Sequence, residues 1–290
     1  MEVIVGLGGA GCSIARQFSN YSEYDVYQLD NVNKREKNYY CLPAYDTHED
    51  YERDFEGLEK FFEKISGDCL FIVSGASAVS GASLVVLEKI SRRCDINVLY
   101  VKPDMTLFSE LKTRQERVVF QVLQQYTRSG VFEKMFIVDN ALVEEVVGTV
   151  SVKNYYNRIN ELIVSTLHMI NVFRHSDSVF GTFSPLASTA NISTFGIVDP
   201  ESGEDKLFYN IEMPRERVYY YGIPNEILEN DENLLKKVKG QMVEKVKQGG
   251  TKVSYGLYAT NYDQTYCYST AHATLVQEEN FNFSVDKSTE

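Results

Sequence analysis

The sequence lacks the features that would insert the chain into a membrane or cross-link it by disulfides. No apolar stretch approaches the roughly 18 residues that a membrane span needs, and no basic region precedes an apolar run at the N-terminus. The five cysteines are odd in number and scattered, without C-x-x-C spacing. Such cysteines indicate free thiols in a reducing compartment. We therefore expect a cytoplasmic protein with no membrane insertion.

Net positive charge and metal-ligand spacing are also lacking. The formal net charge is −12, whereas nucleic-acid binding needs clustered lysine and arginine to neutralise phosphates. We therefore expect no general nucleic-acid binding. The four histidines show no metal-ligand spacing, so no metal centre is predicted. With 290 residues, 43% of them hydrophobic, the chain can bury the core of one large domain or two modest ones.

The N-terminus carries the strongest local signal. An apolar run, Val3–Val5, leads into the glycine-rich turn Gly6–Gly11 and then into the helical pattern Ile14–Phe18. A buried strand, a glycine turn and a helix start form a geometry that binds phosphate. The turn fits G-x-G-x-x-G, which alone is weak evidence, because glycines can also serve packing. Asp30 closes the second predicted strand and fits the acidic residue of a dinucleotide site, so NAD and GTP remain equally supported here.

Strands and helices alternate through the first half of the chain. This rhythm predicts a parallel sheet covered by helices on both faces, which is a Rossmann-like nucleotide-binding α/β domain at residues 1–152. The expected strands are 3–5, 26–29, 70–73, 96–101 and 135–138, and the expected helices include 51–65, 84–91 and a long one ending near 126. The polar stretch 31–47 is expected to be a loop.

The second half has a different character. Apolar residues at helical spacing predict a long central helix over 153–175. Residues 176–275 predict a smaller α+β domain, with an amphipathic helix over 231–248 and a β-hairpin formed by 252–259 and 265–275. Residues 276–290 are acidic and poor in apolar side chains, so we expect a flexible tail.

A second small-residue loop follows the third strong strand. Leu70–Val73 leads into Gly75–Gly81, and a helix pattern follows. Two phosphate-type loops at the ends of parallel strands can hold a nucleotide from both sides, whereas a dinucleotide fold normally uses one. The order of the two loops is therefore more specific than either loop alone.

With these two loops in this order, the chain resembles the tubulin/FtsZ superfamily of GTP-binding filament proteins, in a small prokaryotic, plasmid or phage form. Val98–Pro103 and Phe136–Asn140 resemble the family's next two strands and their polar ends. Tyr156 and Asn160 repeat the Tyr-x-x-x-Asn spacing with which tubulins begin their central helix. Residues four apart share one helix face, so an aromatic ring and a carboxamide can meet the same base there.

The resemblance implies GTP or GDP as ligand, with Mg²⁺ possible, and self-association head to tail into filaments. The acidic tail would be available to an adaptor. The residues that it assigns to the nucleotide come from the two loops and the central helix: Gly8, Gly9, Ala10, Gly11, Cys12, Ser13, Gly75, Ser77, Ser80, Gly81, Tyr156 and Asn160.

Two departures from the family pattern bear on activity. Ala76, Ser77 and Val79 stand where the signature loop has glycine, and the stiff Val79 is expected to project where backbone should approach phosphate. Asp177 is the only acid in 176–189, the region in which the family carries the residues that orient water. We therefore expect hydrolysis to be weak or lost, with Asp177 as the candidate catalytic residue. The alternatives are a non-polymerising tubulin-like regulator and a Rossmann-type NAD(P) enzyme.

Overall fold

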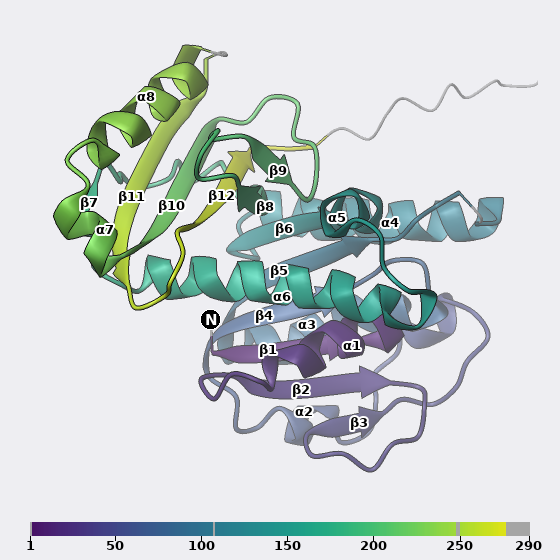
Figure 1. Ribbon diagram of the computed structural model, residues 1–290. Coiled ribbons are helices and arrows are strands. Elements are labelled where there is room, and N and C mark those ends of the chain that lie inside the picture. The colour runs from purple at the N-terminus through teal and green to yellow at the C-terminus, as the bar shows by residue number, and fades with distance from the viewer. Residues whose placement is uncertain (1, 107, 248–249, 277–290) are drawn as a thin grey trace, which may run out of the picture.

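The computed structural model describes residues 2–106, 108–247 and 250–276. Over this part of the chain, one continuous sheet runs through the whole molecule in the order β3-β2-β1-β4-β5-β6-β8-β12-β10-β11-β7, with β9 on β8 (Figure 1). Its first six strands pair in parallel. They are β1 (Val3–Leu7), β2 (Asp25–Asp30), β3 (Tyr39–Cys41), β4 (Gly67–Val73), β5 (Cys94–Lys102) and β6 (Lys134–Asp139). The predicted α/β class with a parallel sheet is confirmed.

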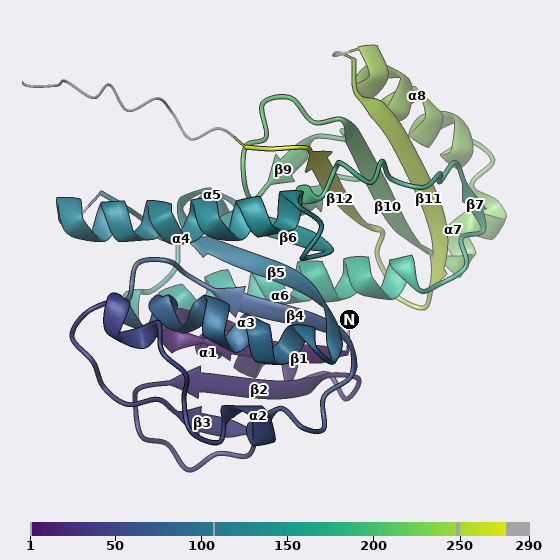
Figure 2. The same ribbon diagram turned by 180° about the vertical axis from the view of Figure 1, so that it is seen from behind.

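Helices cover both faces of the parallel strands because side chains alternate between those faces. Ile4 packs into one core with α1 (Gly8–Phe18), α5 (Asn140–Val147) and α6 (Tyr155–Arg174). Val3 and Val5 pack into the other, with α2 (Leu58–Phe61), α3 (Ser83–Ser91) and α4 (Glu110–Arg128). The two views show α1 and α6 on one side of the sheet and α3 and α4 on the other (Figures 1 and 2).

The second half of the chain extends the same sheet. Its strands are β7 (Phe180–Gly181), β8 (Ile192–Val198), β9 (Asp205–Leu207), β10 (Glu216–Pro224), β11 (Lys252–Thr260) and β12 (Tyr266–Ala273). After α7 (Asn225–Asn230), α8 (Leu234–Lys247) packs Val238 and Met242 onto one face of these strands. The C-terminal end of α6 packs on the other face, where the rings of Phe173 and Tyr258 stack at 4.7 Å. The long central helix therefore joins both halves.

The predicted β-hairpin is wrong, although both of its strands exist. β11 pairs with β10 in parallel and β12 pairs with β10 antiparallel, so β10 separates them. The reason lies in α7 and α8, which form a helical crossover from β10 to β11 and thereby make those two strands parallel neighbours. Tyr219 and Tyr221 on β10 are buried against α8 while Tyr220 packs toward α6, as expected for a central strand.

Three local predictions also need correction. The helix expected over 51–65 is reduced to α2, preceded by the short 3₁₀ helix η1 (Glu49–Tyr51), because Gly57 at φ 79° breaks the chain direction before Leu58. The expected loop 31–47 contains the edge strand β3. The first helix starts at Gly8, so most of the predicted glycine loop is the first turn of α1. The predicted tail lies outside the described residues from 277 onward.

A buried polar group in the second half predicts a pH-dependent stability. His272 accepts or donates hydrogen bonds with Ser193 Oγ at 2.7 Å and Thr270 Oγ1 at 2.8 Å. Burial, with Lys134 and Arg174 nearby, lowers its pKa well below the ordinary value, although Glu216 also lies in this region of the sheet. Below about pH 6.5 the His272 imidazole therefore binds a proton in the unfolded chain but stays neutral in the folded chain.

The free energy of unfolding is accordingly expected to fall by about 1 kcal/mol per pH unit below pH 6.5 through this group. Urea denaturation of His272→Gln between pH 7 and 5 should show a shallower dependence than the unchanged protein. The matched control is His175→Gln, since His175 is exposed at the end of α6. Equal pH slopes for His272→Gln and the unchanged protein would contradict this assignment.

Candidate nucleotide site

The two glycine-containing loops meet at one edge of the sheet. They follow β1 and β4, which are adjacent parallel strands with Val3 opposite Cys69 and Gly6 opposite Ile72. A Cβ atom placed on Gly8 would lie 3.5 Å from Ser77 Oγ and 3.8 Å from Val79 Cγ1. The sequence-predicted loops therefore come into contact through Gly8, Ser77 and Val79.

The first turn of α1 has the properties of an anion site. Gly8 adopts φ +72°, a conformation that favours glycine, and the capping residue Leu7 makes no side-chain hydrogen bond to the helix start. The turn carries no acidic side chain, and Gly9 and Ala10 are exposed. The first four amide N–H groups of a helix have no partner within the helix, and the positive end of its dipole adds to their attraction for phosphate.

The other glycines of this motif serve packing. A Cβ on Gly11 would lie 2.4 Å from the carbonyl oxygen of Ile72, and one on Gly6 would lie 2.5 Å from that of Gly11. They let α1 lie directly against β1 and β4. Cys12 is also buried, and its thiol donates to the carbonyls of Gly6 and Leu29 at 3.3 Å each. Burial raises the pKa of this thiol to about 12, so the Cys12 side chain belongs to the core.

The second loop is held mostly by its own contacts. The hydroxyl of Ser80 donates to the carbonyls of Gly75 at 3.0 Å and Ser77 at 2.6 Å. A Cβ on Gly75 would lie 2.3 Å from the hydroxyl oxygen of Tyr100, and one on Gly81 would lie 2.1 Å from the carbonyl oxygen of His48. Ser80, Gly75 and Gly81 therefore stabilise the conformation of the loop through contacts with its own backbone and with neighbouring residues.

Ser77 and Val79 face different surroundings within this loop. Ser77 is exposed beside Gly8, with its hydroxyl directed to the junction of the two loops. Val79 is 5% exposed and packs into the core, in the 3₁₀ helix η2 (Ala78–Ala82). The branched side chain thus fills space behind Gly8, and of the two, only Ser77 offers a polar group at the surface.

The start of α6 meets the middle and the C-terminal part of α1, beyond its first turn. The Asn160 side-chain amide donates to Ser13 Oγ at 3.1 Å, and Gln17 donates to the Asn157 side chain at 3.0 Å. Tyr156 is 68% exposed one turn before Asn160. Asn160 is only 7% exposed, and the Tyr156 ring meets the ring of Tyr155 edge-on at 5.0 Å. The role of this pair toward a base stays a prediction.

Asn140 was not among the predicted site residues. Its Oδ1 is buried, yet within the described part of the chain it has no hydrogen-bond partner. It begins α5 at the carboxyl end of β6, and α5 is tied to α6 by a hydrogen bond from Tyr155 to Glu144. An unpaired buried acceptor costs free energy unless a ligand or water completes it. The signal in the sequence was its position directly after a buried strand.

Asp177 lies apart from this arrangement, whereas Asp30 lies beside the start of α1. Asp177 is exposed beyond the C-terminal end of α6. At 1.5 Å per residue, the helix from Asn160 to Arg174 alone spans about 21 Å, so Asp177 does not meet the two loops of its own chain. Asp30 is 5% exposed and its carboxylate accepts from the Asn31 amide at 2.9 Å. It follows Leu29, which pairs with Leu7, and its charge adds to burial in raising the pKa of the Cys12 thiol.

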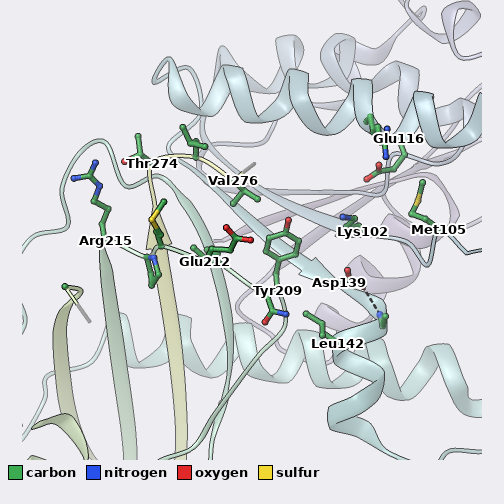
Figure 3. A pocket seen from close by; sticks show the side chains of 18 of the residues that line it. Lys102, Met105, Glu116, Asp139, Leu142, Tyr209, Glu212, Arg215, Thr274 and Val276 are labelled. Atoms are coloured by element: carbon green, nitrogen blue, oxygen red, sulfur yellow. Dashed lines mark hydrogen bonds between the residues drawn. The ribbon is translucent and has the colours of Figure 1, made fainter. Parts of the chain in front are cut away.

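A separate cleft of about 1220 Å³ lies between α4, the end of β6 and residues 209–215 (Figure 3). Tyr209 lies between Glu212 and Lys102, whose ammonium is 5.8 Å from the Tyr209 ring centre. Asp139 caps α5 by accepting from the Ala141 amide at 2.9 Å, and burial raises its pKa. None of the predicted site residues is among the described residues that line this cleft.

The described residues lack both a metal-binding cluster and a membrane-spanning helix. They contain no group of three or more histidine, cysteine, aspartate or glutamate side chains placed to hold a metal ion. Nor do they contain a helix long and apolar enough to cross a lipid bilayer.

Solved structures match the chain closely in shape. TubZ from Bacillus thuringiensis serovar israelensis, in a GTPγS-form protofilament, matches with a TM-score of 0.71 over 93% of this chain and 86% of that one. The chain has the tubulin/FtsZ fold. FtsZ from M. jannaschii, as an empty dimer, matches this tubulin/FtsZ fold with a TM-score of 0.65 over 93% and 87% of the two chains. CetZ from Methanosaeta thermophila matches with 0.67 over 94% and 86%.

The likeness is one of tubulin/FtsZ fold, because the sequences are 16%, 11% and 14% identical respectively. No protein-family profile and no curated protein matches the sequence. The α/β fold class, predicted from the alternation of strands and helices, is confirmed, as is the resemblance in fold to the tubulin/FtsZ superfamily, predicted from the order of the loops. The roles of individual site residues stay predictions.

Proposed function

We propose that this protein binds a guanine nucleotide at the junction of β1, α1 and α6 and assembles head to tail into filaments. The observation that carries the proposal is the uncapped first turn of α1, with Ser77 beside Gly8. Ser13, in the next turn of the same helix, accepts a hydrogen bond from Asn160 of α6. The TubZ relatives are described as protofilaments in GTPγS and GDP forms and as two-stranded filaments. These names support the ligand class and the assembly proposed for this chain.

Each part of the site has a matching part of the nucleotide. The free amides of Gly8–Gly11 and the hydroxyl of Ser77 would hold phosphate oxygens, which in turn would supply most ligands of a Mg²⁺ ion. The Tyr156 ring would stack on the base. Asn160 is 7% exposed, and it would offer a purine the carbonyl oxygen and the amide hydrogen that its bond to Ser13 does not use. Asn140 would add its unpaired acceptor.

Assembly would use the two ends of α6. Its first turn borders the nucleotide, and its last turn lies at the opposite end with Asp177. A head-to-tail contact that does not close into a ring gives a filament, and it would bring Asp177 of one copy toward the nucleotide of the next. One exposed aspartate supplies little general-base catalysis, so we expect slow or absent hydrolysis. The proposed location remains the cytoplasm, and an adaptor role for the tail concerns residues outside the described part.

A non-polymerising regulator is the second candidate. It is favoured by the second loop, because the Ser80 hydroxyl donates to the Gly75 carbonyl and Tyr100 and His48 fill the space beside Gly75 and Gly81. These groups would therefore contribute little to binding a phosphate. Sedimentation and electron microscopy with GTP, a slowly hydrolysed analogue and Mg²⁺ separate the two. Pelleted filaments that require nucleotide support the first proposal, and a persistent monomer that shows no thermal shift with GTP supports the second.

Tyr156→Ala is expected to weaken GTP binding about tenfold. Base–aromatic stacking contributes about 1–3 kcal/mol per base, and Tyr156 is exposed enough that its loss should leave the fold unchanged. Isothermal titration calorimetry measures the change. Val152→Ala is the control, since Val152 is 93% exposed just before the same helix. Equal affinity for GTP in both variants would remove Tyr156 from the site.

A further inference from the structure

A groove of about 280 Å³ lies between α3 and α4, on the face of the sheet opposite α1 and α6. Its walls are apolar side chains from the two helices, namely Leu84, Val85, Val118, Val119, Val122 and Leu123. Leu84 is 38% exposed and Val118 is 57% exposed, so apolar surface of both helices is open to solvent at the rim. The groove is large enough for one or two aromatic rings, since cavities of about 150 Å³ bind benzene.

His48 supplies an unpaired polar atom to this groove. Its side chain is among the lining residues, and the residue is only 8% exposed. Its Nδ1 lies 3.6 Å from a carboxylate oxygen of Glu52, whereas its buried Nε2 has no hydrogen-bond partner among the described residues. A buried polar atom without a partner destabilises the folded protein. A ligand that completed this bond would remove that destabilisation.

We propose that the groove is a binding site for a small aromatic molecule that carries one hydroxyl group. The valine and leucine side chains would cover the ring. The hydroxyl would pair with His48 Nε2, and it can do so whichever tautomer the ring adopts, because a hydroxyl both donates and accepts. Pockets of this kind combine apolar walls with a few fixed polar groups that set the ligand's orientation.

The groove also adjoins the second loop of the proposed nucleotide site. Ser80 and Gly81 line it, and Gly81 packs against the backbone of His48. The Ser80 hydroxyl holds the carbonyls of Gly75 and Ser77, and Ser77 lies beside Gly8. A ligand in the groove would therefore shift the conformation of the Gly75–Gly81 loop, which would face the phosphates in the proposed nucleotide site. This second step rests on the proposed function, whereas binding in the groove does not.

Two probes of nearly equal shape test the binding step on the full chain. Phenol and toluene are titrated separately, and binding is followed by methyl NMR shifts of the valine and leucine residues. Phenol should bind at least fivefold more tightly than toluene, and His48→Phe should remove that preference. Val122→Phe should abolish binding of both probes, while Val131→Phe, on an exposed residue after α4, should leave it intact. Equal affinities for the two probes, or shifts that survive Val122→Phe, would overturn the proposal.

The coupling step is tested by titrating GTP with and without saturating phenol. A change in the dissociation constant of GTP of fivefold or more is expected, within the usual range of coupling between two sites. An unchanged constant would contradict the coupling. Absence of GTP binding in both titrations, with phenol binding retained, would instead refute the proposed nucleotide function and leave the groove assigned.

Discussion

Asp205→Ala is expected to lower the free energy of unfolding by about 3–5 kcal/mol. The Asp205 side chain is 7% exposed, and its Oδ2 accepts from Arg217 Nη1 at 2.9 Å and from the Tyr219 hydroxyl at 2.8 Å. Lys245 of α8 lies 2.8 Å from Oδ1. The carboxylate therefore joins β9, β10 and α8 at one point, and its removal leaves two cations with little water around them.

Urea denaturation measures the loss, and Glu201→Ala provides the comparison. Glu201 also pairs with a lysine of α8, Lys237, but it is 83% exposed, so its removal should cost less than about 0.5 kcal/mol. Both variants delete one carboxylate from an ion pair in the same half of the molecule. If the two variants lost similar free energies of unfolding, burial would not explain the contribution of the Asp205 ion pairs to stability.

Gly11→Ala is expected to cost about 2–3 kcal/mol of stability and to weaken GTP binding at least tenfold. Its Cβ would lie 2.4 Å from the carbonyl oxygen of Ile72, a backbone atom that cannot turn aside. The start of α1 must then move away from β4, and with it the amides proposed to hold phosphate. Thermal unfolding and calorimetric titration with GTP measure the two effects.

Gly9→Ala is the matched control in the same turn. No atom lies within 4 Å of a Cβ at Gly9, and its φ is not positive. Alanine there should leave stability unchanged or raise it by up to about 1 kcal/mol, because alanine is the better helix former. If Gly9→Ala destabilised the protein as much as Gly11→Ala does, close packing of α1 on β4 would not explain the motif.

Hydrophobic patterning predicted the buried strands β1, β2, β4, β5 and β6 of the first half, but not the edge strand β3 or the short length of α2. Buried strands such as Leu70–Val73 and helices such as α3 differ clearly in period and length, so their order implied a parallel sheet. The pairing of β10 with both β11 and β12 was not predictable in this way. Sequence proximity favoured a hairpin, whereas the crossover through α7 and α8 and the two-sided burial of Tyr219 and Tyr220 decided the order.

The site was predictable in outline and less so in detail. Loop order predicted that the two loops lie at one edge of the sheet, and they follow the adjacent strands β1 and β4. The contact of α6 with α1, through the Asn160–Ser13 hydrogen bond, was not predicted. Sequence alone did not separate glycines that open a surface from those that permit close packing. Gly11, Gly75 and Gly81 each touch backbone or side-chain atoms of a neighbouring element, and such contacts depend on tertiary distances. The orphan acceptor of Asn140 likewise becomes visible only when its surroundings are known.

The most direct test of the central claim is to measure which nucleotide the purified protein binds. Calorimetric titration with GTP, ATP and NADH under identical Mg²⁺-containing conditions measures both affinity and stoichiometry. The site described by Gly8–Gly11, Ser77, Tyr156 and Asn160 predicts one GTP per chain, with weaker binding of ATP and none of NADH. Binding of NADH in place of GTP, or no binding of any of the three, would contradict it.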